Sequence, residues 1–271
     1  MTRRSAQVAL AVLATTVLPT FPGARAESQP YYLALGDSYS SGSGAPPYDP
    51  ESGDCHRSSL GYPSLAAGQP PARDWTFGFI ACSGATTDDV NRPDETGQAH
   101  QVEEVGDGVR LVTITIGGND ARFGAMVRRC ALGSVPCTEE NDDEEAFIEN
   151  EVRPKLKTTY ARLRAASTEA RMVVLTYVHI FQTEDHCARE PGIQNDEKAW
   201  IRDRTDQLND LIEEEATAAG LEVLDVRDAL AGHEICTAEP WVNGWGQEGS
   251  FHPNATGYEA LARQLVEHLN R

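Results

Sequence analysis

The chain has 271 residues, a length that suits one large domain or two small ones. Its 42 acidic residues outnumber 23 basic ones, which gives a formal net charge of −19. A surface of that sign repels nucleic acid and anionic bilayers, so we expect no nucleic-acid partner.

The first 26 residues are organised like a secretory signal peptide. Arg3 and Arg4 form a basic start, residues 8–18 are apolar, and Ala24-Arg25-Ala26 is an A-x-A cleavage sequence. The apolar run is short for a membrane span, although an uncleaved anchor is the alternative. We expect cleavage near Ala26, extracellular export and no stable membrane insertion. No linker divides the rest, so residues 27–271 are predicted to form a single domain.

Five apolar segments rich in β-branched and aromatic residues predict buried strands. They cover residues 31–35, 75–81, 109–116, 172–178 and 221–226. Helices are predicted at 62–67 and 121–130, along an amphipathic stretch from 148 to 163 that Pro154 would kink, around 200–212, and after Asn254. Strands that alternate with helices over the whole length predict an α/β fold, with a parallel sheet covered on both faces.

Six cysteines lie after the signal segment, and an even count in an exported chain predicts three disulfides. Fifteen pairings are possible. We expect the nearest-neighbour pairing, because it ties successive loops together without crossing: Cys55–Cys82, Cys130–Cys137 and Cys187–Cys236. A zinc site is disfavoured because no C-x-x-C pair is present. The acidic run Glu139–Glu145 could hold calcium, but its spacing is not that of an EF-hand loop, so we interpret it as a solvated helix start.

Small polar residues follow three of the predicted strands. Ser38 follows the first, Gly84 the second and Asn119 the third. The carboxyl ends of parallel strands meet at one rim, where ligands bind. A serine there can act as a nucleophile if a base and oxyanion donors are present, and the Ser38 N–H, the Gly84 N–H and the Asn119 amide are candidate donors. His252, just before the last helix, is the candidate base.

Each of these residues also has a structural interpretation. Ser38 could cap a helix, Gly84 could serve a turn, Asn119 could form an Asx-turn, and His252 could be a surface residue. The segment from Gly36 to Gly44 could also be a phosphate-binding loop, although it lacks the Gly-Lys-Ser/Thr sequence. A secreted binding module without catalysis is the other non-enzyme alternative.

Four sequence blocks occur in an order that resembles the SGNH, or GDSL, hydrolases. The blocks are Gly36-Asp37-Ser38, Ser83-Gly84-Ala85-Thr86, Gly117-Gly118-Asn119-Asp120 and Phe251-His252-Pro253-Asn254. The cysteine pairs and the start of the mature chain resemble the secreted actinomycete lipases and esterases of that family.

The resemblance implies a three-layer α/β/α sandwich with a five-stranded, parallel, doubly wound sheet. Ser38 would be the nucleophile and His252 the general acid and base, with Ser38, Gly84 and Asn119 as the oxyanion hole. The function would be hydrolysis of acyl esters as a lipase or esterase, with phospholipase A or carbohydrate acetyl esterase as alternatives. No metal or organic cofactor is expected, and the partner would be a small-molecule or lipid ester bound by a monomer.

One position departs from the family pattern. An aspartate usually stands three residues before the histidine, but that position here is Gly249. We expect a main-chain carbonyl of the 248–250 turn, that of Gly249, to hold His252 Nδ1, with the Glu248 side chain as the alternative. Asp37 is too near Ser38 in sequence to serve behind the histidine. Tyr39, Tyr177 and Trp245 are candidates to line the acyl groove, and His179 is interpreted as structural.

Overall fold

The structure is a computed structural model that describes residues 30–91, 101–133, 137–138, 142–184, 187–190 and 192–271. The predicted signal peptide, residues 1–26, lies outside these residues. Five strands form one parallel sheet in the order β2-β1-β3-β4-β5. The strands are β1 (Tyr31–Gly36), β2 (Thr76–Phe79), β3 (Val109–Thr115), β4 (Arg171–Leu175) and β5 (Glu222–Leu224).

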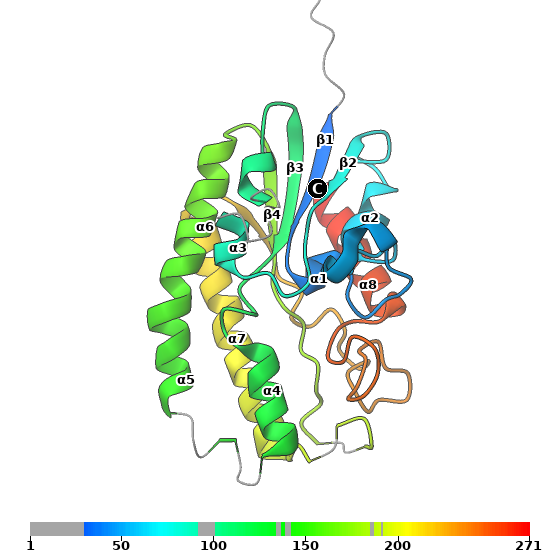
Figure 1. The fold of residues 1–271 in the computed structure, drawn as a ribbon, viewed down its shortest axis with the longest axis vertical. Helices are drawn as coiled ribbons and strands as arrows, with labels where there is room; N and C mark the ends of the chain where they lie inside the picture. Colours follow the sequence, from blue (N-terminus) through cyan, green and yellow to red (C-terminus); the bar gives the residue numbers. More distant parts are fainter. Residues whose placement is uncertain (1–29, 92–100, 134–136, 139–141, 185–186, 191) are drawn as a thin grey trace, which may run out of the picture.

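Helices cover both faces of the sheet, so the predicted three-layer α/β/α sandwich is confirmed (Figure 1). On one face α2 (Tyr62–Ala67) packs with α8 (Ala255–Leu269). On the other face α6 (Arg153–Ala166) packs with α3 (Thr87–Asn91) and α7 (Asn195–Ala218). The remaining helical segments are α1 (Ser38–Ser41), η1 (Pro50–Cys55), η2 (Gln101–Glu104), α4 (Phe123–Leu132), α5 (Asp142–Phe147) and the π-helical η3 (Ile148–Val152).

Several predicted elements have different ends in the structure. β4 stops at Leu175 rather than residue 178, because the Asn209 side-chain amide of α7 bonds both the N–H and the C=O of Tyr177 at 2.8 Å. α4 starts at Phe123 rather than residue 121, because residues 117–122 form a tight turn in which the Ala121 N–H bonds the Gly117 carbonyl. Turn geometry and tertiary hydrogen bonds therefore set these boundaries, and hydrophobic patterning does not report them.

The helix predicted to kink at Pro154 is irregular at that point. α5 and α6 are joined by the π-helical residues of η3, and Pro154 lies in the first turn of α6. Proline has no N–H to donate to the preceding turn, so a wider turn there is the expected adjustment. α5 begins within the acidic run, as predicted for a helix start, while residues 139–141 of that run lie outside the described residues.

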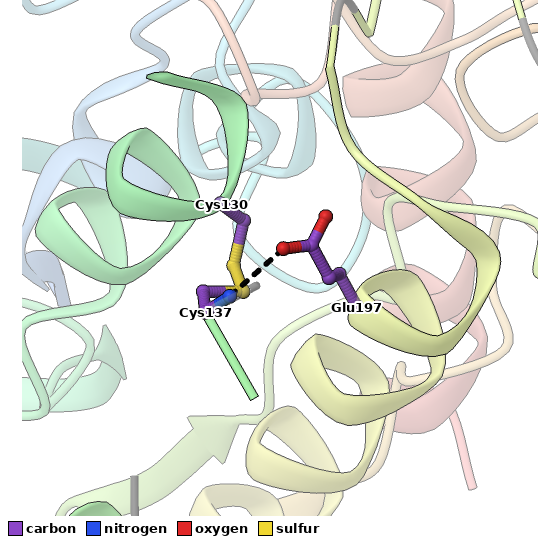
Figure 2. Close-up of side chains that lie close together, drawn as sticks. All are labelled: Cys130, Cys137 and Glu197. Atoms are coloured by element: carbon purple, nitrogen blue, oxygen red, sulfur yellow. Dashed lines mark hydrogen bonds between the residues drawn. A yellow bond between two sulfur atoms is a disulfide. The ribbon is translucent and has the colours of Figure 1, made fainter. Parts of the chain in front are cut away.

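All three disulfides join nearest neighbours, as predicted: Cys55–Cys82, Cys130–Cys137 and Cys187–Cys236. Cys130 and Cys137 lie beside the buried carboxylate of Glu197, which accepts a hydrogen bond from the Cys137 N–H at 2.9 Å (Figure 2). A second oxygen of Glu197 accepts from the Gln194 N–H and completes a capping box at the start of α7. The carboxylate therefore joins this disulfide loop to α7.

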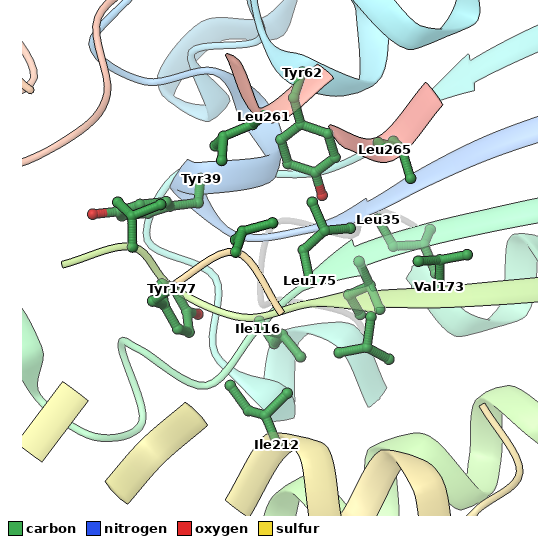
Figure 3. Packing of buried hydrophobic residues seen from close by; sticks show 14 of the residues in the cluster. Leu35, Tyr39, Tyr62, Ile116, Val173, Leu175, Tyr177, Ile212, Leu261 and Leu265 are labelled. Atoms are coloured by element: carbon green, nitrogen blue, oxygen red, sulfur yellow. The ribbon is translucent and has the colours of Figure 1, made fainter. Parts of the chain in front are cut away.

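The hydrophobic core lies between the sheet and its two helical layers. In Figure 3 the side chains of Leu261 and Leu265 from α8 lie on one side of the strands, and Ile212 from α7 lies on the other. Leu35 and Val173 are buried between them. Among the described residues, no helix is long and apolar enough to cross a membrane.

Candidate active site

The candidate site lies where the sheet changes its winding direction. β2 and β3 flank β1 on opposite sides, and ligands of open parallel sheets bind at such a switch point. β1 leads directly into Asp37 and Ser38, and β3 leads into the turn that holds Asn119. The loop before α8 brings His252 to the same rim, where it contacts Ser38.

Ser38 and His252 form a hydrogen-bonded pair across 214 residues of sequence. Ser38 Oγ lies 2.7 Å from His252 Nε2, and His252 Nδ1 lies 3.0 Å from the Ser250 carbonyl oxygen. A carbonyl only accepts, so Nδ1 carries the proton and the Nε2 lone pair accepts from the serine hydroxyl. Burial lowers the pKa of His252 from its ordinary 6.5, and the carbonyls of Ser250 and Gly249 act in the opposite direction. The imidazole is therefore neutral at pH 7, which is the form a general base needs.

The carbonyl behind His252 belongs to Ser250, so the prediction that Gly249 supplies it was wrong. The Gly249 carbonyl instead accepts from the His252 backbone N–H at 3.0 Å. Phe251 has a φ of +67°, and this left-handed residue between Ser250 and His252 turns the chain there. The Glu248 side chain is exposed and makes no hydrogen bond with His252 in the described part of the chain.

There is no room for a side chain at position 249. Its φ is +63°, and a Cβ built there would lie 2.4 Å from the Cα of Gly44 and 2.5 Å from its nitrogen. Contacts that short do not occur in folded proteins, so the aspartate usual in the family does not fit this turn. The loop carrying His252 therefore packs backbone to backbone on the loop after Ser38.

Asn119 presents a side-chain amide at this rim. One amide hydrogen bonds the Ala85 carbonyl, with Nδ2 2.9 Å from the oxygen. No second partner of this Nδ2 occurs among the described residues, so the other hydrogen is available to a ligand. Because Ala85 belongs to the loop after β2, the same bond links that loop to the turn after β3.

The two backbone donors occupy tight turns. Ser38 is the first residue of α1, where an N–H has no partner within its helix, and none occurs elsewhere in the described chain. Gly84 is exposed in the turn between Cys82 and Ala85, and its N–H likewise has no partner among the described residues. The Cys82 N–H bonds the Gly36 carbonyl at 2.9 Å, which brings this turn to the end of β1.

A cavity of about 640 Å³, measured with its open mouth, extends from Ser38 between α4 and α7. Ser38, Asn119 and His252 line it, whereas Gly84 does not. Its remaining lining is mostly apolar and includes Tyr39, Phe123, Val127, Tyr177, Val178, Leu208 and Phe251. Tyr39 and Tyr177 thus lie where they were predicted. Trp245 does not line the cavity: its ring packs against that of Phe251, with centroids 6.0 Å apart.

Two buried polar residues to which the sequence analysis assigned no role hold the site loops. The Gln101 side-chain amide bonds both the N–H and the C=O of Gly36, at 2.6 and 3.1 Å. The Asp120 carboxylate accepts from the N–H and the hydroxyl of Thr87, both at 2.8 Å. Both contacts join residues far apart in sequence, so no local pattern signals them.

Asp37 is almost fully buried and does not contact His252. Its Oδ1 accepts from the Tyr39 N–H at 3.0 Å, which caps α1, and its Oδ2 accepts from the Tyr177 hydroxyl. Burial raises the pKa of Asp37 to about 7, and the bonds from Tyr177 and Tyr39 oppose that rise. Its role is thus to organise the nucleophile turn, and the prediction that it does not stand behind the histidine agrees with these contacts.

Two groups of residues are candidate metal ligands: the acidic run that the sequence pointed to, and a cluster of two cysteines and a glutamate that the fold brings together. The contacts of both groups argue against metal binding. The sulfurs of Cys130 and Cys137, near Glu197, are joined to each other and offer no thiolate (Figure 2). In the acidic run, Glu144 pairs with Arg129 and Glu145 with Arg204. His179, interpreted as structural from the sequence, is buried between the carboxylates of Asp206 and Asp228.

Comparison with known proteins agrees with this geometry. Residues 34–260 match the GDSL-like lipase/acylhydrolase family, and the chain belongs to that family. A lipase of Streptomyces rimosus is 37% identical over 263 residues, which cover 94% of each chain. Lipase 1 of Streptomyces coelicolor is 36% identical and covers 93% of this chain and 91% of that protein.

Solved structures show the same similarity. The crystal structure of the extracellular lipase of Streptomyces rimosus superposes with a TM-score of 0.78 at 35% identity, covering 88% of this chain and 99% of that one. That of phospholipase A1 from Streptomyces albidoflavus superposes with a TM-score of 0.77 at 36% identity, covering 89% and 99%. The protein is therefore an enzyme, a carboxylic ester hydrolase of the lipase and acylhydrolase type.

Proposed function

We propose that the protein is an exported lipase that cleaves acyl esters through an acyl-enzyme formed on Ser38. The observation that carries this proposal is the pair of hydrogen bonds on His252, to Ser38 Oγ at 2.7 Å and to the Ser250 carbonyl at 3.0 Å. A serine aligned with a neutral, oriented imidazole at the end of an apolar cavity can perform two-step acyl transfer.

In the first step Ser38 Oγ attacks the ester carbonyl carbon while its proton moves to His252 Nε2. The negative oxygen that forms is held by the Ser38 N–H, the Gly84 N–H and the Asn119 amide. The intermediate collapses, the alcohol leaves with the proton from Nε2, and the acyl group remains on Ser38. Water then gives a proton to Nε2 and attacks the acyl carbon. The second tetrahedral intermediate collapses, the bond from the acyl carbon to Ser38 Oγ breaks, and Nε2 returns its proton to that oxygen as the acid leaves.

The Ser250 carbonyl takes the place of the carboxylate that completes a Ser-His-Asp triad. It fixes the tautomer and the orientation of His252, which is a large part of that residue's work. A dipole stabilises the imidazolium formed during the reaction less than a carboxylate does. We therefore assign a Ser-His pair supported by the backbone.

Glu248→Gln is expected to leave kcat for a p-nitrophenyl ester within about twofold, as for an exposed substitution. Glu239→Gln, an exposed glutamate of the same long loop, is the matched control. A loss of roughly 10³-fold or more, confined to the Glu248 variant, would instead indicate that Glu248 completes a triad.

The apolar lining of the cavity supports acyl chains rather than acetyl groups as substrates. Tyr39, Phe123, Val127, Val178 and Leu208 offer hydrocarbon and ring surface next to Ser38. Phospholipase A activity is the second candidate, because the phospholipase A1 structure is as similar to this chain as the lipase structure. The acetylxylan esterase structures, at 17–18% identity, share the fold alone.

A substrate panel tests the assignment. The purified protein is assayed with p-nitrophenyl acetate, butyrate, octanoate and palmitate and with phosphatidylcholine. We expect kcat/KM to rise from acetate to the longer acyl chains, because the added methylenes enter the apolar cavity. A maximum at acetate would favour a carbohydrate acetyl esterase, and turnover of phosphatidylcholine above that of all p-nitrophenyl esters would favour a phospholipase.

Export is supported by three disulfides, by the signal-like first 26 residues and by similarity to an extracellular lipase. We propose that residues 1–26 are removed and that residues 27–271 act as a single-domain monomer. The ester substrate is its partner, and the acidic surface favours uncharged or zwitterionic lipid over anionic bilayers.

A further inference from the structure

Tyr177 lies between the turn that holds Ser38 and the turn that holds Asn119. It follows β4, and the side-chain amide of Asn209 bonds its N–H and its C=O. Its ring packs edge-on against the ring of Tyr39, with centroids 5.1 Å apart (Figure 3). On its other side it approaches Gly118 so closely that a Cβ on Gly118 would lie 3.0 Å from Tyr177 Cζ. The backbone and the ring of Tyr177 are therefore both fixed by their neighbours, and so is the position of its hydroxyl.

The hydroxyl of Tyr177 connects two backbone turns through hydrogen bonds of defined direction. The Gly118 N–H lies 2.8 Å from the hydroxyl oxygen and can only donate to it. The hydroxyl proton is then free for Asp37 Oδ2, which accepts it. Gly118, Tyr177 and Asp37 are all buried, so removing the hydroxyl breaks two hydrogen bonds between groups that have little exposure to solvent.

We infer that Tyr177 is a positioning residue, whose hydroxyl sets the place of Asn119 relative to Ser38. Gly118 immediately precedes Asn119, and Asp37 immediately precedes Ser38 and caps the helix that Ser38 begins. One oxygen atom thus joins the turn of the oxyanion donor to the turn of the nucleophile. The inference rests on the proposed function, in which Ser38 attacks and Asn119 holds the oxyanion.

The chemical consequence concerns the transition state. The Asn119 amide must meet the oxygen that becomes negative only when Ser38 attacks, so its distance from Ser38 matters most at that moment. A misplacement of about 1 Å by a change outside the reacting groups can cost ~10²-fold in rate. Loss of the hydroxyl should therefore lower kcat and leave ester binding in the apolar cavity intact.

Tyr177→Phe keeps the ring and removes only the bridging oxygen. We expect kcat for p-nitrophenyl octanoate to fall by ~10- to 10²-fold, with KM unchanged. Tyr160→Phe is the matched control. Tyr160 is also a fully buried tyrosine, and its hydroxyl has no hydrogen-bond partner among the described residues. That variant should keep the kcat of the parent enzyme.

A double-mutant cycle with Asn119→Ala separates positioning from a general structural role. If Tyr177 acts through Asn119, adding Tyr177→Phe to Asn119→Ala should lower kcat by less than threefold, because the donor it places is already absent. A full second loss in the double variant would overturn the inference, as would a Tyr177→Phe enzyme that equals Tyr160→Phe.

Rates are expressed per active site titrated with a fluorophosphonate, so that misfolded protein does not enter kcat. Gly118→Ala is a second probe, because its methyl group would push the Tyr177 ring from the other side. It should lower kcat in the parent enzyme and have little effect beside Asn119→Ala, and an unchanged parent kcat would count against the inference. If the fluorophosphonate does not label Ser38 in the parent enzyme, the proposed function fails and not the role of Tyr177 alone.

Discussion

Replacing Ser38 with alanine is expected to lower kcat for a soluble p-nitrophenyl ester by roughly 10⁴- to 10⁶-fold. In the proposed mechanism the hydroxyl oxygen bonds to the acyl carbon, and no other group takes its place once it is removed. Residual turnover would come from water attacking an ester that is still bound in the cavity and polarised by the oxyanion donors. Initial rates over a range of substrate concentrations, with KM and kcat separated, provide the measurement.

The control for this result is Ser59→Ala, which removes an exposed serine hydroxyl from the loop that follows Ser38. It should keep full activity and full labelling by a fluorophosphonate, whereas Ser38→Ala should lose both. Labelling that persists in Ser38→Ala would mean that another residue is the nucleophile, and the acyl-enzyme assignment would then be withdrawn.

Asn119→Ala is expected to lower kcat by ~10²- to 10³-fold with a small change in KM. In the proposed mechanism the amide stabilises negative charge that exists only after Ser38 has attacked, so its loss should affect the transition state more than the bound ester. The substitution also removes the bond to the Ala85 carbonyl, which links the loops after β2 and β3. Part of the loss could therefore come from movement of Gly84.

A thermal melt separates these two causes. A kcat loss in Asn119→Ala without a comparable loss of melting temperature would assign the effect to the missing donor. Asn270→Ala, in which an exposed amide at the end of α8 is removed, is the control for deleting an asparagine side chain. An Asn119→Ala enzyme with the parent kcat would contradict the oxyanion assignment.

The sequence was sufficient to predict the sheet and the residues that lie together at its rim. Strands such as Val109–Thr115 carry unbroken β-branched and aliphatic runs, which burial on both faces of a parallel sheet requires. The end of each strand then places Ser38 and Asn119 by topology alone. The nearest-neighbour disulfides also follow from chain order.

The finer geometry of the site depends on contacts that a single sequence does not encode locally. Whether the carbonyl of Gly249 or that of Ser250 faces His252 depends on the torsions of a turn that packs against Gly44, more than 200 residues earlier. The exclusion of Trp245 from the cavity follows from the path of the same long loop. The bridge from Tyr177 to Gly118 and Asp37 joins three different strand ends, and none of these residues indicates it alone.

The hydrogen bond between Ser38 and His252 also has a consequence for timing. The serine follows the first strand, while its base stands 214 residues later, immediately before the final helix. A chain emerging from its amino end carries the nucleophile for most of its synthesis without the imidazole that activates it. In the folded protein α8 packs against α2, and the loop that holds the histidine immediately precedes α8. The proposed activity therefore depends on a contact between two segments that are far apart in the chain.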